Sequence, residues 1–239
     1  MALDKSLPII ALDFPSGEKV LRFLDLFNEP LNVKVGMELF YAEGASFLQQ
    51  VKQRGHAIFL DLKLHDIPNT VERAMAVLAR LNVDMVNVHA TGGQAMMAAA
   101  LRGLTHGTPP GQSRPLLIAV TQLTSTHSDH LYKEQGVKES LEENVLRLAR
   151  LSKNSGLDGI VCSPLESTLI KETLGEDYLT ITPGIRLHDS KADDQTRILT
   201  PSQARQAGSH YIVVGRPVTQ AEDPVSVYKD ILTQWQKSN

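Results

Sequence analysis

Short apolar runs rich in Val, Ile and Leu alternate with helix-forming segments along all 239 residues of the chain. Such runs predict buried strands, and a regular strand-then-helix order predicts parallel strands joined by right-handed crossovers. The eight predicted strands begin at Leu7, Leu31, Ala57, Met85, Pro115, Gly159, Leu179 and Tyr211. Eight such units whose sheet closes on itself form a (β/α)8 TIM barrel. We therefore predict an α/β protein with a single barrel domain over residues 1–239; an open doubly wound sheet is the structural alternative.

Capping residues mark several of the intervening helices. Ser16 is a candidate N-cap for the segment that follows it, and Pro68 and Pro224 stand at first-turn positions of two others. Gly156 is expected to be the C-cap of the helix that begins near Ser140. These signals support the strand-then-helix order.

Three longer stretches have no regular pattern: residues 105–115, 124–136 and 186–197. In a barrel, the loops that follow strands lie on the face where sites are assembled. The second and third stretches follow predicted strands, so we predict that they are lids over a site. The first stretch precedes a strand and is expected to be structural.

Charge and cysteine content exclude several classes of function. The formal net charge is −3 and the charges are interspersed, so neither nucleic acid nor an anionic membrane surface is an expected partner. No run approaches the roughly 18 apolar residues of a membrane span, and the N-terminal apolar run is too short for a signal peptide and is interrupted by Asp13. The single cysteine, Cys162, excludes an internal disulfide and fits a reducing compartment. We expect a cytoplasmic protein.

The stretch LDLKLHDIPN, residues 60–69, places charges within a predicted buried strand. Alternate side chains of a barrel strand face the interior, so Asp61 and Lys63 share the interior face while the leucines pack against helices. One such pair could simply fill the barrel. Further polar residues stand in or at the ends of other predicted strands: Asp13, Lys34, Thr121 and Thr124. Because buried ions are costly unless they neutralise one another, this clustering favours a catalytic site.

The neighbours of Lys63 indicate what it does. Carboxylates on either side should keep its ammonium group charged even where water is excluded. A lysine that forms a Schiff base must be neutral to attack a carbonyl, so this setting favours a proton donor over a covalent nucleophile. We interpret Lys63 as an acid and a cation.

A glycine and an arginine directly follow the last predicted strand. Gly215 lets the backbone approach an anion, and the guanidinium of Arg216 offers a forked pair of donors. TIM barrels often bind phosphate in the loops after strands seven and eight, and the stretch after the seventh strand adds Arg186. Ordinary turn chemistry is the alternative, but this position favours a small phosphate ester as the substrate.

A metal site receives less support. The histidines that raise the question are His65, His89, His127 and His130. Neither an HxxEH-like helix nor a carboxylate-rich cluster accompanies them, so core or loop roles are favoured. Glu38 could join Asp61 around Mg²⁺, but Lys34 and Lys63 would compete for the carboxylates. We expect no metal, and we expect Cys162 to be a buried strand residue.

Six stretches occur in order along the chain: LPIIALDF, VKVGMELF, FLDLKLHDIPNTV, AVTQLTS, TPGIR and IVVGR. Together they resemble the orotidine 5′-phosphate decarboxylase family, in its bacterial form, from the first strand to the last. The Asp-x-Lys-x-x-Asp core alone is shared with other sugar-phosphate enzymes. The resemblance implies a carboxy-lyase that converts orotidine 5′-monophosphate to UMP and CO2, the last step of de novo UMP biosynthesis, without cofactor or metal.

The resemblance also implies roles for individual residues. Lys63 is implied as the proton donor to C6 of the pyrimidine, in an alternating array with Lys34, Asp61 and Asp66. Asp66 and Thr70 are implied to act in the site of a neighbouring subunit, which would make the protein a homodimer with shared sites. The implied substrate contacts are Asp13 and Lys34 to the ribose, Thr124 to the pyrimidine, and Arg186, Gln195, Gly215 and Arg216 around the phosphate.

Two other functions stay open on the sequence. One is a decarboxylase or lyase for an acyclic sugar phosphate, with Mg²⁺ held by Glu38 and Asp61. The other is a barrel that binds a nucleotide without catalysis.

Overall fold

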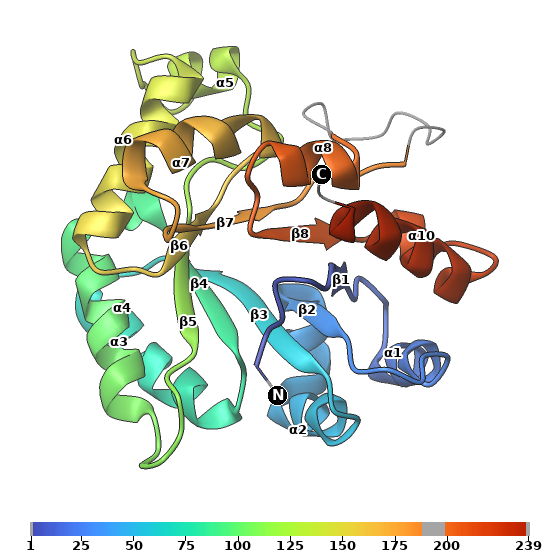
Figure 1. Ribbon diagram of the computed structural model, residues 1–239. Helices are drawn as coiled ribbons and strands as arrows, with labels where there is room; N and C mark the ends of the chain where they lie inside the picture. Colours follow the sequence, from blue (N-terminus) through green and yellow to red (C-terminus); the bar gives the residue numbers. More distant parts are fainter. Residues whose placement is uncertain (1, 188–198, 238–239) are drawn as a thin grey trace.

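A computed structural model describes residues 2–187 and 199–237. Within this part of the chain, eight parallel strands form a closed barrel in sequence order (Figure 1). The strands are β1 (Ile9–Ala11), β2 (Asn32–Gly36), β3 (Ala57–Leu64), β4 (Met85–His89), β5 (Leu116–Val120), β6 (Gly159–Val161), β7 (Leu179–Thr182) and β8 (Tyr211–Val214). The predicted TIM barrel is confirmed, and the open sheet is excluded because β8 pairs with β1 through Ile9 and Val213.

Helices surround the strands (Figure 1). Over the described ranges they are α1 (Gly17–Leu24), α2 (Met37–Gln53), α3 (Pro68–Leu78), α4 (Gly93–Gly107), α5 (Ser128–Lys133), α6 (Leu141–Asn154), α7 (Ser167–Leu174), α8 (Pro201–Gln206), α9 (Arg216–Thr219) and α10 (Pro224–Gln236). Short 3-10 turns occur at Ala79–Leu81, Ala90–Gly92 and Pro164–Glu166. No helix among the residues described has the length and apolar character needed to cross a membrane.

The predicted helix boundaries are mostly observed. The side chain of Ser16 caps α1, and Pro68 and Pro224 occupy the first turns of α3 and α10. The C-cap of α6 is Ser155 rather than the predicted Gly156, which follows it with a φ of 82°. The positive φ explains the glycine, because the chain leaves the helix through a left-handed residue one position after the C-cap.

One predicted loop differs from expectation, and most of another lies outside the described residues. The stretch 124–136 was predicted to be irregular but contains α5, whose first turn is capped by the ring of His127 accepting the His130 N–H. Leu131 is the buried residue of this helix, so the sequence shows no apolar period there. In the stretch 186–197, the residues from 188 onward, including Gln195, lie outside the described residues.

Apolar side chains fill the inside of the barrel as well as the layer beneath the helices. Phe59 belongs to the interior cluster, together with residues such as Ile9 and Met85. Leu60 and Leu62 belong to the outer cluster between strands and helices. The alternation predicted for β3 is therefore observed. Since apolar groups fill the interior here, polar side chains on the same strand faces gather nearer the carboxyl ends.

Helices α3 and α4 pack with their backbones in close approach. A Cβ added at Gly103 would lie 2.1 Å from the carbonyl oxygen of Glu72, and one added at Gly107 would lie 2.5 Å from that of Ala76. Neither distance leaves room for a side chain. Glycine is thus required at both positions by the helix pairing that supports β3 and β4.

Replacement of Gly103 by alanine is expected to destabilise the protein by about 1–3 kcal/mol, because the added methyl group forces the two backbones apart. Without this contact, the same change within a helix would stabilise the protein by up to about 1 kcal/mol. Denaturation curves of the two proteins distinguish these signs. An unchanged or raised midpoint would show that α3 and α4 are not held this closely.

Candidate active site

A cavity of about 250 Å³ lies at the carboxyl ends of the barrel strands. The predicted site residues that line it are Asp13, Lys34, Asp61, Lys63, Thr124, Arg186, Gly215 and Arg216. Thr121 is buried and is not among the lining residues; its hydroxyl donates to the carbonyl of Val161 at 3.0 Å. One cavity thus collects groups that come from six different strands or from the loops that follow them.

Asp66 and Thr70 lie outside that cavity. Both are exposed and line a second hollow with Met37 and Tyr41. The Asp66 carboxylate accepts the N–H of Ile67 at 2.6 Å. Within one chain, the structure therefore separates these two predicted residues from the cavity.

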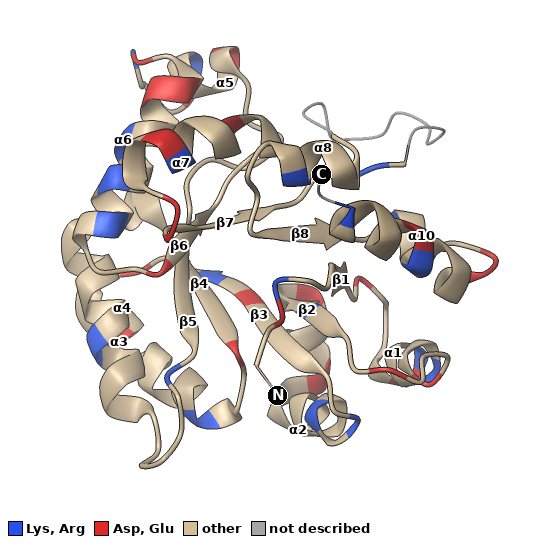
Figure 2. Ribbon diagram, in the orientation of Figure 1, with Lys and Arg blue, Asp and Glu red and all other residues tan. Residues whose placement is uncertain are grey.

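Three charges from β2 and β3 form the centre of the cavity wall. Lys63 Nζ lies 2.6 Å from Asp61 Oδ1, and Lys34 Nζ lies 3.2 Å from Asp61 Oδ2. Lys34 also reaches Asp13 Oδ1 at 3.5 Å. Figure 2 shows acidic and basic segments interrupting β3 in the barrel, whereas most other charged segments lie on helices and loops. The order of signs is Asp13, Lys34, Asp61 and Lys63, in which each charge has an opposite neighbour.

Asp61 is the most buried member of this array, with 8% of its side chain exposed. Burial by itself raises the pKa of Asp61. The ammonium groups of Lys34 and Lys63, with hydrogen bonds from Lys63 and Asn87, outweigh burial and hold this pKa below its ordinary value. Asp61 is therefore a fixed negative charge at neutral pH.

Asn87 in β4 completes the surroundings of Asp61 and was missed by the sequence analysis. Its side-chain nitrogen donates to Asp61 Oδ1 at 2.7 Å, and its oxygen accepts the backbone N–H of Lys63 at 2.7 Å. A usable signal was present: in the strand MVNVH, Asn87 has the same parity as Met85, which faces the barrel interior. A polar residue with interior parity indicates a buried hydrogen-bonding role.

Lys63 has an unusual backbone conformation. Its φ is 50°, in the left-handed region that side chains disfavour by roughly 1–3 kcal/mol. In the described part of the chain, the one other non-glycine residue with positive φ is Asn82, at the end of a helical turn. A strained residue in a cavity wall points to a functional constraint on its side chain.

The histidines near the cavity do not form a metal site with the carboxylates. The rings of His65 and His89 lie 5.7 Å apart. Burial, the neighbouring His65 and the Lys63 ammonium lower the pKa of His89, so its ring is neutral at pH 7. Among the described residues, no three His, Cys, Asp or Glu side chains are grouped to hold a metal ion. Asp61 itself already bonds two ammonium groups.

The opposite part of the cavity wall comes from the loops after β7 and β8. Arg186 is largely buried and donates to the carbonyl oxygen of Ile185 at 2.8 Å. Gly215 precedes α9, and Arg216 is the first residue of that helix. Arg186, Gly215 and Arg216 all line the cavity. Two guanidinium groups beside one space suit a dianion such as a phosphate.

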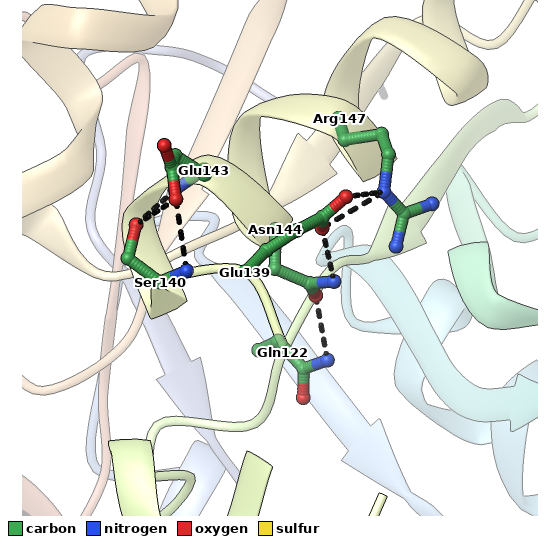
Figure 3. A network of polar contacts seen from close by, with 6 residues as sticks. All are labelled: Gln122, Glu139, Ser140, Glu143, Asn144 and Arg147. Atoms are coloured by element: carbon green, nitrogen blue, oxygen red, sulfur yellow. Dashed lines mark hydrogen bonds and ion pairs between the residues drawn. The ribbon is translucent and has the colours of Figure 1, made fainter. Parts of the chain in front are cut away.

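A polar network fixes the wall that follows β5 (Figure 3). Gln122 lines the cavity and donates to Asn144 of α6 at 3.0 Å and to Gln135 at 3.1 Å. Asn144 in turn donates to Glu139 at 3.0 Å, and Arg147 donates to the same carboxylate at 2.9 Å. Because Gln122 is two residues from Thr124, this network anchors the start of the segment that carries the predicted pyrimidine contact.

Comparison with known proteins supports the family resemblance along the whole barrel. A sequence model of the orotidine 5′-phosphate decarboxylase / HUMPS family matches residues 6–231. Proteins named orotidine 5′-phosphate decarboxylase from Staphylococcus saprophyticus and Staphylococcus aureus are each 58% identical over 231 residues, covering 97% of this chain and 99% of theirs. A crystal structure of orotidine 5′-phosphate decarboxylase from Lactobacillus acidophilus has 44% identity and a TM-score of 0.87, covering 96% of this chain and 98% of that one. The chain therefore belongs to the orotidine 5′-phosphate decarboxylase / HUMPS family.

Proposed function

We propose a mechanism by which this barrel carries out the reaction of its relatives. The chain is a carboxy-lyase of pyrimidine biosynthesis that converts orotidine 5′-monophosphate to UMP and CO2. The observation that carries the mechanism is the contact of Lys63 and Lys34 with the buried Asp61 carboxylate in the cavity wall. In this mechanism, Lys63 is the proton donor to C6.

Loss of CO2 leaves a carbanion at C6 of the pyrimidine. A fixed ammonium group about 4 Å away stabilises a unit negative charge by about 4 kcal/mol at an effective dielectric constant of about 20. That energy corresponds to roughly a thousandfold in rate. Lys63 provides this charge before the proton is transferred and then donates the proton itself, so one group acts as cation and acid.

Asp61 keeps the array in place and adds negative charge where the substrate carboxylate departs. Its oxygens already bond Lys34 and Lys63, which supports a positioning role for the carboxylate. Its charge also lies next to the space that the leaving carboxylate would occupy in this mechanism. Both contributions require an ionised Asp61, in agreement with its lowered pKa.

The rest of the substrate is assigned to the remaining cavity walls. Asp13 and Lys34 would bind the ribose, and Thr124 would bind the pyrimidine. The phosphate would lie against Gly215, Arg216 and Arg186, with Gln195 as a further proposed contact. The two guanidinium groups on the cavity wall support this orientation, because they are the groups best suited to a phosphate dianion.

A homodimer with shared sites is part of the proposal. Asp66 and Thr70 would reach the cavity of a second copy, where Asp66 would extend the charged array. Their exposure on the chain, outside its own cavity, supports this arrangement. Apolar side chains nearby, Met37, Tyr41 and Ile67, are exposed to an extent expected of an interface.

We also propose a cytoplasmic location. It rests on the biosynthetic reaction and on the cysteine content: the sequence has one cysteine, Cys162, which cannot form a disulfide within the chain. A chain with this cysteine content needs no oxidising compartment to fold.

The metal-dependent alternative is tested by assaying the purified protein with orotidine 5′-monophosphate in excess EDTA. Full UMP formation is expected, because Lys63 supplies the charge that a metal ion would otherwise provide. Lys63→Ala is the control for contaminating activity, and it should reduce turnover by at least about 100-fold. Activity that returns only when Mg²⁺ is added would favour the alternative. Lys63→Ala turnover within about tenfold of wild type would refute the proton donor.

The phosphate assignment is tested with Arg216→Ala. We expect kcat/KM for orotidine 5′-monophosphate to fall by about 10- to 100-fold, because a charged hydrogen bond is lost. The value for the nucleoside orotidine, which has no phosphate, should change little. Arg54→Ala is a matched control, since Arg54 pairs with Asp25 on the surface. Equal losses on both substrates would place Arg216 elsewhere in the mechanism.

The shared site is tested by mixing Lys63→Ala and Asp66→Ala proteins, each inactive alone. A mixed dimer would hold one intact site and one doubly altered site. After statistical exchange, half of the dimers are mixed, so about a quarter of the wild-type activity should return. Subunit exchange is followed separately by mass spectrometry of differently tagged chains. Exchange without recovered activity would show that each chain completes its own site.

A further inference from the structure

We infer that Asn87 is a positioning residue for this reaction: it holds Lys63 and Asp61 in reacting geometry without touching the substrate. Asn87 is buried in β4, and it is not among the residues that line the cavity. Its side chain contacts both members of the central ion pair at 2.7 Å. This inference rests on the proposed mechanism and adds a residue to it.

The backbone of Lys63 needs the bond to Asn87. Leu60 of β3 pairs with Val86 of β4, and Leu64 pairs with Val88. The two pairs are thus four residues apart in β3 but two residues apart in β4. Regular ladder pairing is therefore interrupted at Lys63, and an unpaired N–H would be costly there. Asn87 is the β4 residue inside the interrupted interval, and its amide oxygen accepts that N–H.

The amide of Asn87 has one orientation that satisfies both contacts. The Lys63 N–H can only donate, so it must face the amide oxygen. The Asp61 carboxylate can only accept, so it must face the amide nitrogen. Lys63 Nζ then closes the set by donating to the same Asp61 oxygen at 2.6 Å. The three residues form a ring of hydrogen bonds in which each member bonds the other two.

This ring explains how Lys63 keeps a positive φ. A residue with a side chain stays in the left-handed region only when its surroundings hold it there. Asn87 holds the backbone end of Lys63, and Asp61 holds the ammonium end. Without Asn87, the backbone can relax toward ordinary strand geometry, and the ammonium group would move away from its position beside C6.

Asn87 also contributes to keeping Asp61 ionised. The charged or titratable groups around Asp61 are Lys34 from β2, Lys63 from its own strand, His89 from β4 and, beyond Lys34, Asp13. The hydrogen bond from Asn87 adds to the effect of the two lysines in lowering the pKa of Asp61. Its loss shifts that pKa upward, so activity should be lost at a higher pH as the solution is acidified.

The decisive measurement is the kinetics of Asn87→Ala. We expect kcat to fall by about 100-fold, because a displacement of about 1 Å in a reacting group has this effect. Binding of UMP, measured by calorimetry, should stay within about threefold of wild type, because Asn87 does not contact the ligand. The acid limb of the kcat/KM profile should move to higher pH.

Two further variants separate positioning from simple destabilisation. Asn87→Asp has nearly the same shape and can still accept the Lys63 N–H, but it cannot donate to Asp61 when ionised; we expect a loss of kcat and a similar shift of the acid limb. Asn32→Ala removes another fully buried asparagine, whose side chain donates to Asp4 and Leu7 at the start of β2. It should lower the melting temperature and leave kcat and the pH profile unchanged.

Each outcome has a separate meaning. Asn87→Ala with kcat within about threefold of wild type and an unshifted acid limb would overturn the inference. If Asn87→Ala does not fold, the same comparison is made with Asn87→Asp, whose wild-type kinetics would overturn it equally. A wild-type protein that does not decarboxylate orotidine 5′-monophosphate would contradict the proposed function instead.

Discussion

The buried carboxylate of Asp61 is the constraint on which the geometry of the site depends. An ion taken out of water costs several kcal/mol unless opposite charges and hydrogen bonds replace the water. Lys34, Lys63 and Asn87 provide that replacement from three adjacent strands. Removing any one of them takes a partner from the buried Asp61 carboxylate, so the register of β2, β3 and β4 is tied to the placement of the charges.

The barrel itself was predictable because its signals are local and repeated. Eight apolar runs with intervening helical sequence indicate parallel strands, and cap residues such as Ser16 and Pro68 act within a few residues of themselves. The predicted elements differ from the structure where the local sequence pattern is weak or where tertiary contacts determine the conformation. Helix α5 buries Leu131 alone, and the end of α6 is displaced by one residue from the glycine that was expected to close it.

The residues of the candidate active site were predictable only in part. Strand parity alone placed Asp61 and Lys63 inside the barrel, and topology placed Arg216 at the end of the last strand. Parity could not show that the β3 ladder is interrupted, because a bulge depends on how two strands fit together. The role of Asn87 depends on that interruption. Because Asn87 is uncharged, a search for charged residues in predicted strands did not identify it.

The two ends of the cavity have opposite energetic roles. In the proposed mechanism, the array of Lys34, Asp61 and Lys63 would stabilise the charge that develops at C6, and the Asp61 carboxylate would repel a substrate that is still carboxylated. The guanidinium groups of Arg186 and Arg216, which line the cavity, would bind the phosphate in every state of this reaction. Binding energy from this remote group can therefore offset the unfavourable approach of like charges. In this mechanism, a carboxylate held as firmly as Asp61 would not move away when the substrate enters, so its repulsion of the substrate carboxylate would be relieved by loss of CO2.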